Sequence, residues 1–191
     1  MKIIKSYAKI NLTLKVLKKL KNGMHDIESH ACLIDLHDRI EIKKNKKDRV
    51  IFIGKFKKEI NQGKNSISDT LKILREKNII NYFYRIVVRK NIPVCSGLGG
   101  GTANSVSLTK YFMKNNPKEF LIRKLEKKIG SDFRLFLNSF SFQKNLKKIQ
   151  GRKKFFTLHF LIVYPMINCR TKHIYSRVKK FSFSKKKHYF T

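Results

Sequence analysis

The first part of the chain alternates between apolar and polar positions. Apolar residues occupy every second position from Ile10 to Val16, and this period of two predicts a half-buried β-strand. Asn22-Gly23 predicts a tight hairpin turn after that strand. We expect a second extended stretch from there to about Leu36, a turn at Asp38 and a third strand over Arg39–Lys43.

The middle of the chain changes to a helical period. Asn65 or Ser66 can cap a helix that ends near Lys77, because apolar residues recur between them at helical spacing. Aromatic and β-branched residues then predict a strand over Tyr82–Arg89. A second helix is expected over Ala103–Lys114.

The last part of the chain contains two more helical signals and one apolar run. Pro117 suits the first position of a helix and Gly130 suits its end, so we expect a helix between them. Asp132 would then lie in the connection just beyond that helix. The apolar run predicts a strand over Phe156–Tyr164, and Thr171–Val178 predicts a final short helix. This order of elements favours a mixed α+β domain over a doubly wound sheet.

A glycine-rich segment, Gly97-Leu98-Gly99-Gly100-Gly101, separates the predicted strand Tyr82–Arg89 from the helix that begins near Ala103. Glycine allows the backbone to adopt positive φ and to approach a ligand closely, and successive N–H groups can form an anion-binding nest. The positive end of the following helix adds to this attraction. The segment therefore predicts a polyphosphate site, although its spacing matches neither a Walker loop nor a dinucleotide fingerprint. A flexible linker is the alternative.

Phosphoryl transfer at such a site needs a cation and a group that accepts the proton of the attacking hydroxyl. Lys9 could supply the cation, since it shares a strand face with Asn11. Asp132 could supply the base, and Thr102 could cap its helix, contact a phosphate or reach Mg²⁺. Neither main role follows from spacing alone, because Lys9 could be an ordinary lysine and Asp132 could cap the next element.

The charge of the chain supports a competing interpretation. It has 45 Lys+Arg against 12 Asp+Glu, and this net charge of +33 is typical of proteins that bind polyanions. The lysines are spread along the chain, however, and they interleave with aromatic residues mainly in the tail Lys179–Tyr189. We therefore expect nucleic acid to be bound only nonspecifically through the basic surface.

Cysteine usage and hydropathy bear on the compartment. Cys32, Cys95 and Cys169 have spacings that fit neither a zinc site nor a disulfide framework. No apolar run approaches the ~20 residues of a membrane span, and the N-terminus has no signal-peptide pattern. These features predict a cytoplasmic protein without a membrane partner.

Four segments in consistent order resemble the GHMP kinase superfamily: Ala8–Leu14, Gly23–His25, Pro93–Asn104 and Ile129–Asp132. Within the superfamily, the chain is most similar to the family that phosphorylates diphosphocytidyl-methylerythritol. The resemblance implies the GHMP kinase N-terminal ATP-binding domain, an α+β fold of the ribosomal protein S5 domain 2-like type, over residues 1–150. It also implies only the start of a second domain over 151–178, then a basic tail over 179–191.

The resemblance also implies a reaction. ATP, with Mg²⁺, would phosphorylate the 2-hydroxyl of 4-diphosphocytidyl-2-C-methyl-D-erythritol on the methylerythritol phosphate route to isoprenoids. Asp132 would take the hydroxyl proton, and Lys9 would hold that carboxylate and screen the transferring group. The residues that the resemblance places around the ATP phosphates are Pro93, Val94, Cys95, Ser96, Gly97, Leu98, Gly99, Gly100, Gly101, Thr102 and Ala103.

The resemblance also implies residues that would contact the adenine of ATP and the cytosine and methylerythritol parts of the substrate. Asn65 falls near the adenine pocket of the family. His25 would read the cytosine edge, Tyr175 would stack on cytosine, and Asn11 would help to place the methylerythritol end.

The chain departs from the family pattern in three places. Met24 stands where the family usually carries a tyrosine that stacks on cytosine, and Phe133-Arg134 stands where it commonly carries a small apolar residue and proline. The sequence also ends at Thr191, before the family's second half. These departures keep two other hypotheses open: a degenerate relative that binds nucleotide without transfer, and a polyanion-binding basic protein. The oligomeric state is not predicted.

Overall fold

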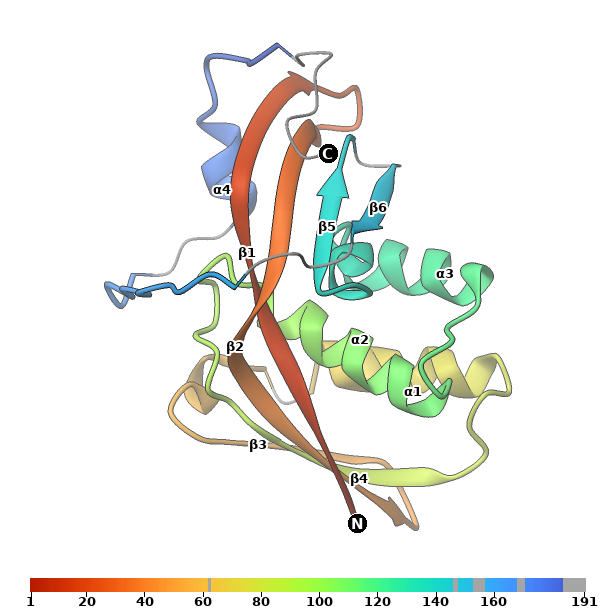
Figure 1. The fold of residues 1–191 in the computed structure, drawn as a ribbon. Helices are drawn as coiled ribbons and strands as arrows, with labels where there is room; N and C mark the ends of the chain where they lie inside the picture. Colours follow the sequence, from red (N-terminus) through yellow and green to blue (C-terminus); the bar gives the residue numbers. More distant parts are fainter. Residues whose placement is uncertain (62, 146–147, 153–156, 168–170, 184–191) are drawn as a thin grey trace.

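The structure is a computed structural model that describes residues 1–61, 63–145, 148–152, 157–167 and 171–183. Within these residues the strands form one mixed sheet in the order β3-β4-β2-β5-β6, and β1 also pairs with β2 (Figure 1). The strands are β1 Lys2–Lys19, β2 His25–Asn45, β3 Arg49–Ile53, β4 Phe83–Arg89, β5 Phe140–Gln143 and β6 Ile149–Arg152. The helices are α1 Ser66–Glu76, α2 Gly100–Phe112, α3 Glu119–Ile129 and α4 Thr171–Ser176, with 3₁₀ turns η1 Lys57–Glu59 and η2 Phe133–Phe136.

β1 and β2 form a long antiparallel hairpin on which the rest of the sheet is built. Their pairing extends from Lys2 opposite Ile42 to Lys19 opposite His25, with register shifts along the way. On the edge of β2 away from β1, its first half pairs with β5 and its second half pairs with β4. The hairpin therefore joins two smaller groups of strands into one sheet.

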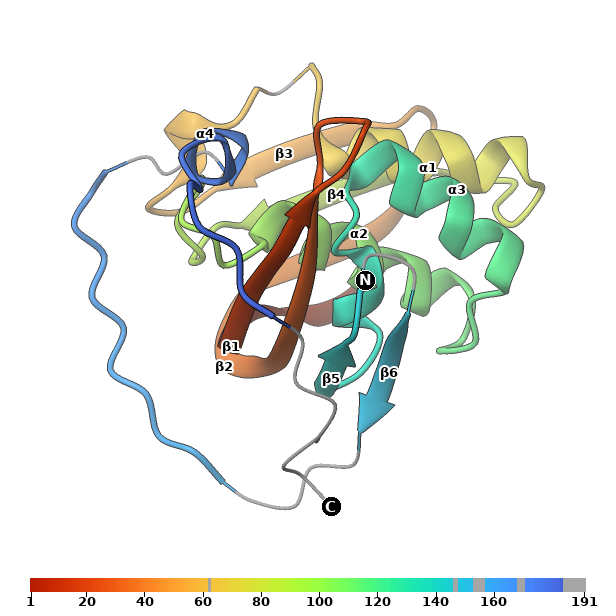
Figure 2. The same cartoon turned by 90° about the horizontal axis from the view of Figure 1, so that it is seen from above.

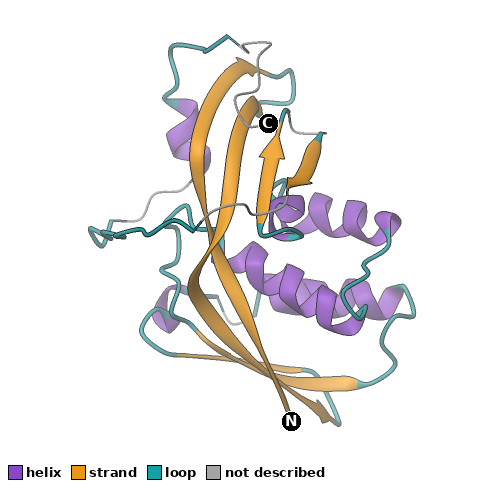
Figure 3. Cartoon of the chain, in the orientation of Figure 1, coloured by secondary structure: helices purple, strands orange, loops and turns teal. Residues whose placement is uncertain are grey.

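The helices α1, α2 and α3 pack together on one face of this sheet (Figures 1 and 3). Their fully buried residues, such as Leu71, Leu108 and Leu121, meet Ile40 of β2 and Ile86 of β4 in a single core cluster. α4 lies on the other side of the hairpin (Figure 2). This architecture confirms the predicted α+β fold. None of the described helices is both long and apolar enough to cross a bilayer.

The turn predicted at Asp38 is wrong, because β2 runs through this residue without a break. The Asp38 side chain is completely buried and forms an ion pair with Lys90, whose side chain is 3% exposed. Oδ1 of Asp38 also accepts hydrogen bonds from the backbone N–H groups of Asn91 at 2.8 Å and Ile92 at 2.9 Å. A carboxylate with these donors can stay in the interior. Its partners lie far away in the sequence, so the local pattern does not reveal them.

The predicted helices are confirmed, with shifted ends. Asn65 is the N-cap of α1, as predicted. α2 begins at Gly100, earlier than expected, because the low helix propensity of glycine hides its first turn from the sequence pattern. α3 begins at Glu119 and not at Pro117, and Gly130 follows its end as predicted.

The strand predicted over Phe156–Tyr164 is wrong for its described part, residues 157–164, which has no regular secondary structure. Leu161 is 93% exposed and Val163 is 78% exposed there. Apolar β-branched residues favour extended backbone, but a strand also needs a neighbour for its N–H and C=O groups. β3, β5 and β6 are not predicted from the sequence, because each is only four or five residues long.

Asp38→Ala is expected to lower the free energy of unfolding by about 3–5 kcal/mol, because it leaves Lys90 buried without its counter-ion. Denaturant unfolding followed by circular dichroism measures this change. Asp35→Ala is the matched control, since Asp35 lies on the same strand with a side chain that is 88% exposed. The control should change stability by at most about 0.5 kcal/mol. Equal losses in both variants would show that the buried pair does not stabilise the fold.

Candidate active site

The connection from β4 to α2 contains several left-handed backbone conformations. Cys95, Gly97 and Gly99 have φ values of 53°, 78° and 69°. Gly99 is the N-cap of α2, no side chain caps this helix, and its first turn contains no acidic residue. The N–H groups at this end therefore lack a side-chain acceptor, and the helix dipole favours an anion beside them.

Gly99 packs directly against the turn that carries Asp132. A Cβ atom on Gly99 would lie 2.4 Å from Cζ of Phe136 and 3.4 Å from Oδ2 of Asp132. At Gly97, by contrast, a Cβ atom would meet nothing within 4 Å. The loop backbone thus lies close to the Asp132 carboxylate at Gly99 and has open space beside it at Gly97. Only glycine allows the close approach at Gly99.

Strand β1 brings Lys9 to the same loop. The backbone N–H of Lys9 donates to the carbonyl oxygen of Leu98 at 3.1 Å. Nζ of Lys9 donates to Oδ1 of Asn11 at 2.5 Å, and Nδ2 of Asn11 donates to Oγ of Ser29 at 2.6 Å. Ser29 on β2 therefore orients the Asn11 amide toward Lys9. Ser29 is not predicted from the sequence, because its position near Asn11 depends on the register of the hairpin.

Lys9 and Asp132 are close enough to shift each other's pKa. Burial raises the pKa of Asp132, while the charge of Lys9 and a hydrogen bond from Oγ1 of Thr102, at 3.0 Å, oppose that rise. Burial lowers the pKa of Lys9, and the charge of Asp132 opposes that fall. A carboxylate with raised proton affinity therefore lies beside a cation at the start of α2.

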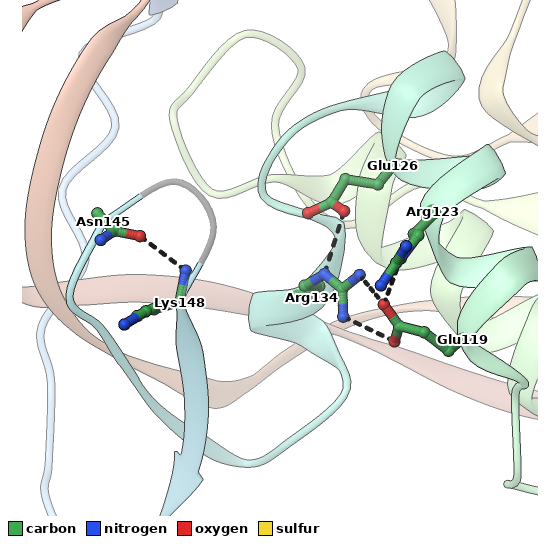
Figure 4. Close-up of polar contacts among 6 residues, drawn as sticks. All are labelled: Glu119, Arg123, Glu126, Arg134, Asn145 and Lys148. Atoms are coloured by element: carbon green, nitrogen blue, oxygen red, sulfur yellow. Dashed lines mark hydrogen bonds and ion pairs between the residues drawn. The ribbon is translucent and has the colours of Figure 1, made fainter.

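The two residues after Asp132 anchor the turn between α3 and η2. Phe133 is completely buried. Arg134 donates to both carboxylate oxygens of Glu119, at 2.7 and 3.0 Å, and to Oε2 of Glu126 at 3.1 Å (Figure 4). Hydrogen bonding from Arg134 is the largest cause that lowers the pKa of Glu119 to about 2. The pair that departs from the family pattern thus fixes this turn to the core and to α3.

An aromatic cluster lies at the turn end of the hairpin. The ring centroid of His25 is 5.5 Å from that of Tyr175 on α4 and 6.4 Å from that of Phe181, and the His25 ring is stacked with each of them. Burial raises the pKa of Tyr175, and the charge of Asp132 adds to the rise. His25 and Tyr175 therefore come together, while Met24 remains 45% exposed. Phe181 is not identified from the sequence, because it falls among the lysines of the tail.

Asn65 lies beside the start of the glycine loop's helix. Its side chain accepts a hydrogen bond from the backbone N–H of Ser68 at 3.0 Å, which starts α1. Oγ of the next residue, Ser66, is 3.6 Å from where a Cβ atom of Gly101 would lie. The N-termini of α1 and α2 are thus neighbours.

Two side chains beside the loop carry oxygen atoms that could bind a metal ion, the Asp132 carboxylate and the Thr102 hydroxyl. Mg²⁺ prefers oxygen ligands and is commonly held by one or two carboxylates together with substrate phosphates. The donor set therefore fits Mg²⁺ that arrives with a nucleotide. In the described part of the chain, no group of three or more His, Cys, Asp or Glu residues could hold a metal ion.

Several known proteins have sequences similar to that of this chain. The family model "GHMP kinases N terminal domain" matches residues 65–134. A 4-diphosphocytidyl-2-C-methyl-D-erythritol kinase of Pelagibacter ubique is 40% identical over 189 residues, which cover 94% of this chain and 66% of that protein. The kinase of the same name from Ureaplasma parvum is 31% identical over 185 residues, which cover 91% of this chain and 68% of that protein. The chain spans about two thirds of the length of these relatives.

Solved structures share the fold. A crystal structure of 4-(cytidine 5'-diphospho)-2C-methyl-D-erythritol kinase superposes with a TM-score of 0.55 at 24% identity, covering 71% of this chain and 48% of that chain. The mevalonate kinase of Methanococcus jannaschii superposes with a TM-score of 0.54 at 16% identity, covering 80% of this chain and 56% of that chain.

Gly99→Ala is expected to destabilise the protein by about 2–4 kcal/mol, because left-handed backbone strain adds to the overlap with Phe136. Gly97→Ala introduces similar strain without overlap, so it should cost only about 1–2 kcal/mol. Urea unfolding of the two variants gives the comparison. If Gly97→Ala lowers the free energy of unfolding as much as Gly99→Ala does, the loop does not pack closely against Phe136.

Proposed function

Because this chain belongs to the 4-diphosphocytidyl-2-C-methyl-D-erythritol kinase family of GHMP kinases, we propose that it transfers the γ-phosphoryl group of ATP to the 2-hydroxyl of 4-diphosphocytidyl-2-C-methyl-D-erythritol. One observation carries the proposal. Lys9 from β1 and Asp132 from the turn after α3 meet beside an uncapped helix start in a glycine loop. Phosphoryl transfer depends on this combination of anion site, cation and base.

The nucleotide would bind along the loop from Pro93 to Ala103. Its phosphates would accept hydrogen bonds from the N–H groups of the loop and of the first turn of α2. Asn65, at the neighbouring start of α1, would lie toward the adenine. Thr102 would help to hold Mg²⁺, which when bound neutralises charge on the transferring phosphoryl group.

Asp132 would act as the base. As the 2-hydroxyl oxygen forms its bond to the γ-phosphorus, the bond between that phosphorus and the β–γ bridging oxygen breaks and ADP leaves. Asp132 takes the hydroxyl proton and later releases it to water. Its raised pKa makes it a better proton acceptor, and the neighbouring Lys9 keeps it ionised before the reaction.

The rest of the substrate would lie along the hairpin. Asn11, oriented by Ser29, would hold the methylerythritol end near Lys9. His25 and Tyr175, at the hairpin's turn end, would bind the cytosine, with Tyr175 on the side of Asp132. Opening the stack between these two rings would make room for the base between aromatic faces.

Asp132→Asn should reduce turnover by at least about 100-fold, because the amide cannot accept the hydroxyl proton. ATP affinity should change by less than about twofold, since the glycine loop is intact. Transfer of labelled γ-phosphate to diphosphocytidyl-methylerythritol gives the rate, and calorimetry gives the affinity. Asp35→Asn, on an exposed side chain of β2, is the control.

Two outcomes would count against the proposal. An equal loss of turnover and ATP affinity in Asp132→Asn would remove its role as base. ATP binding by the unaltered chain without any transfer would instead support a nucleotide-binding relative without kinase activity.

Lys9→Met should move the acid limb of the pH profile of kcat/KM to higher pH. Asp132 must be ionised to accept a proton, so the rate falls as the pH drops through its pKa. The charge of Lys9 lowers that pKa, and its removal therefore raises it. Lys15→Met is the control on the same strand, because Lys15 pairs with Glu28. A limb that stays in place in Lys9→Met would show that Lys9 does not act on the base.

A further inference from the structure

Strands β1 to β4 have a face that points away from α1, α2 and α3 (Figure 1). Side chains alternate across a strand, so the burial pattern of β4 identifies this face. Arg85 and Arg89 are exposed, whereas Ile86 and Val88 are completely buried under the helices. The cross-strand register then assigns residues of the neighbouring strands to the same open face.

A first row of cations crosses this open face. Arg85 on β4 lies opposite Arg49 on β3 and opposite Lys43 on β2. All three residues are exposed. Like charges directly opposite one another destabilise a sheet, so this row favours an anion that would screen it.

A second row of cations runs parallel to the first. Arg39 on β2 lies opposite Arg89 on β4 and opposite Lys5 on β1. Arg89 follows Arg85 by four positions along β4, which places the rows about 13 Å apart. We call the two rows together the basic sheet face: Arg49, Arg85, Lys43, Arg89, Arg39 and Lys5.

The floor between the rows is mainly apolar. Val87 lies opposite Ile51 and Glu41, and it is only 6% exposed, so it is recessed between the longer side chains. Phe83 shares the open face with Arg85 by alternation and is 44% exposed, and Cζ of Arg75 lies 4.7 Å from the centroid of its ring. The ring face of Phe83 away from Arg75 is the aromatic surface next to the first row.

No residue of the basic sheet face forms an ion pair within the described chain. Other arginines do pair with carboxylates, for example Arg75 with Asp48 and Arg134 with Glu119. Four of the chain's ten arginines belong to this face. The arginine guanidinium matches phosphate oxygens with two parallel hydrogen bonds, so the face is suited to phosphates.

We propose that the basic sheet face binds single-stranded RNA. A strand lying along the floor would have cations on both sides for its phosphates, and its bases would lie over the floor and against the Phe83 ring. The recessed floor does not suit an anionic membrane, which needs apolar side chains that protrude into it. The inference is independent of the kinase proposal, because no residue of this face belongs to the glycine loop or to the Lys9–Asp132 pair.

Binding is tested by fluorescence anisotropy with a labelled oligouridylate of about 12 nucleotides, over a series of salt concentrations. Arg39→Gln/Arg85→Gln removes one cation from each row. Lys118→Gln/Lys127→Gln removes the same charge from exposed positions on and next to α3. The first variant should lose at least about tenfold in affinity, and its salt dependence should fall by about 1.4 in slope, whereas the second should lose less than about twofold.

Folding is checked separately by thermal unfolding. Both double glutamine variants should keep the unfolding midpoint of the unaltered chain. Arg39→Lys/Arg85→Lys should retain more of the affinity than the glutamine variant, since the charges remain. Equal losses in the two glutamine variants would mean that total charge alone binds RNA and would overturn the proposal. Absence of binding near physiological salt would also overturn it. Tighter binding to phosphatidylserine vesicles than to RNA, lost in Arg39→Gln/Arg85→Gln, would reassign the face to a membrane.

Discussion

The structure depends on one buried carboxylate. Asp38 neutralises Lys90 in the interior and holds the backbone N–H groups of the next two residues, Asn91 and Ile92. These contacts attach the chain that leaves β4 to the middle of the longest strand. The glycine loop follows at once, and Nζ of Lys90 lies 3.1 Å from where a Cβ atom of Gly100 would be, under the first turn of α2. The position of the anion site is therefore set by a charge pair that the anion itself never touches.

The sequence predicted best the features that depend on neighbouring residues. Asn65 as a helix cap, Gly130 as a helix end and Asp132 in the following connection all follow from local backbone chemistry. The errors came from contacts between distant segments. Asp38 resembles a turn residue until its partner Lys90 is known, and the apolar run 157–164 resembles a strand although the described chain offers no strand beside it.

In the candidate site, too, features that depend on neighbouring residues were predictable and features that depend on distant contacts were not. The glycine loop can be recognised from its own residues, but nothing near Lys9 distinguishes it from the other lysines. Family resemblance selected Lys9 and Asp132, and the fold then brought them together through β1 and the turn after α3. Ser29 and Phe181 could be identified only from the hairpin register and the ring contacts of the structure. Boundaries of the domains at residues 150 and 178 stay predictions.

In the proposed reaction, the amides between Gly97 and Thr102 bind the phosphates of ATP next to Lys9 and Asp132. Amide ¹H–¹⁵N chemical shifts during titration with a non-hydrolysable ATP analogue and Mg²⁺ test it most directly. We expect saturable shifts centred on Gly97, Gly99, Gly101 and Thr102, with smaller ones at Lys9, whose backbone N–H donates to the carbonyl oxygen of Leu98 in that loop. Shifts spread over the lysine-rich surface, with these glycine amides unchanged, would contradict it.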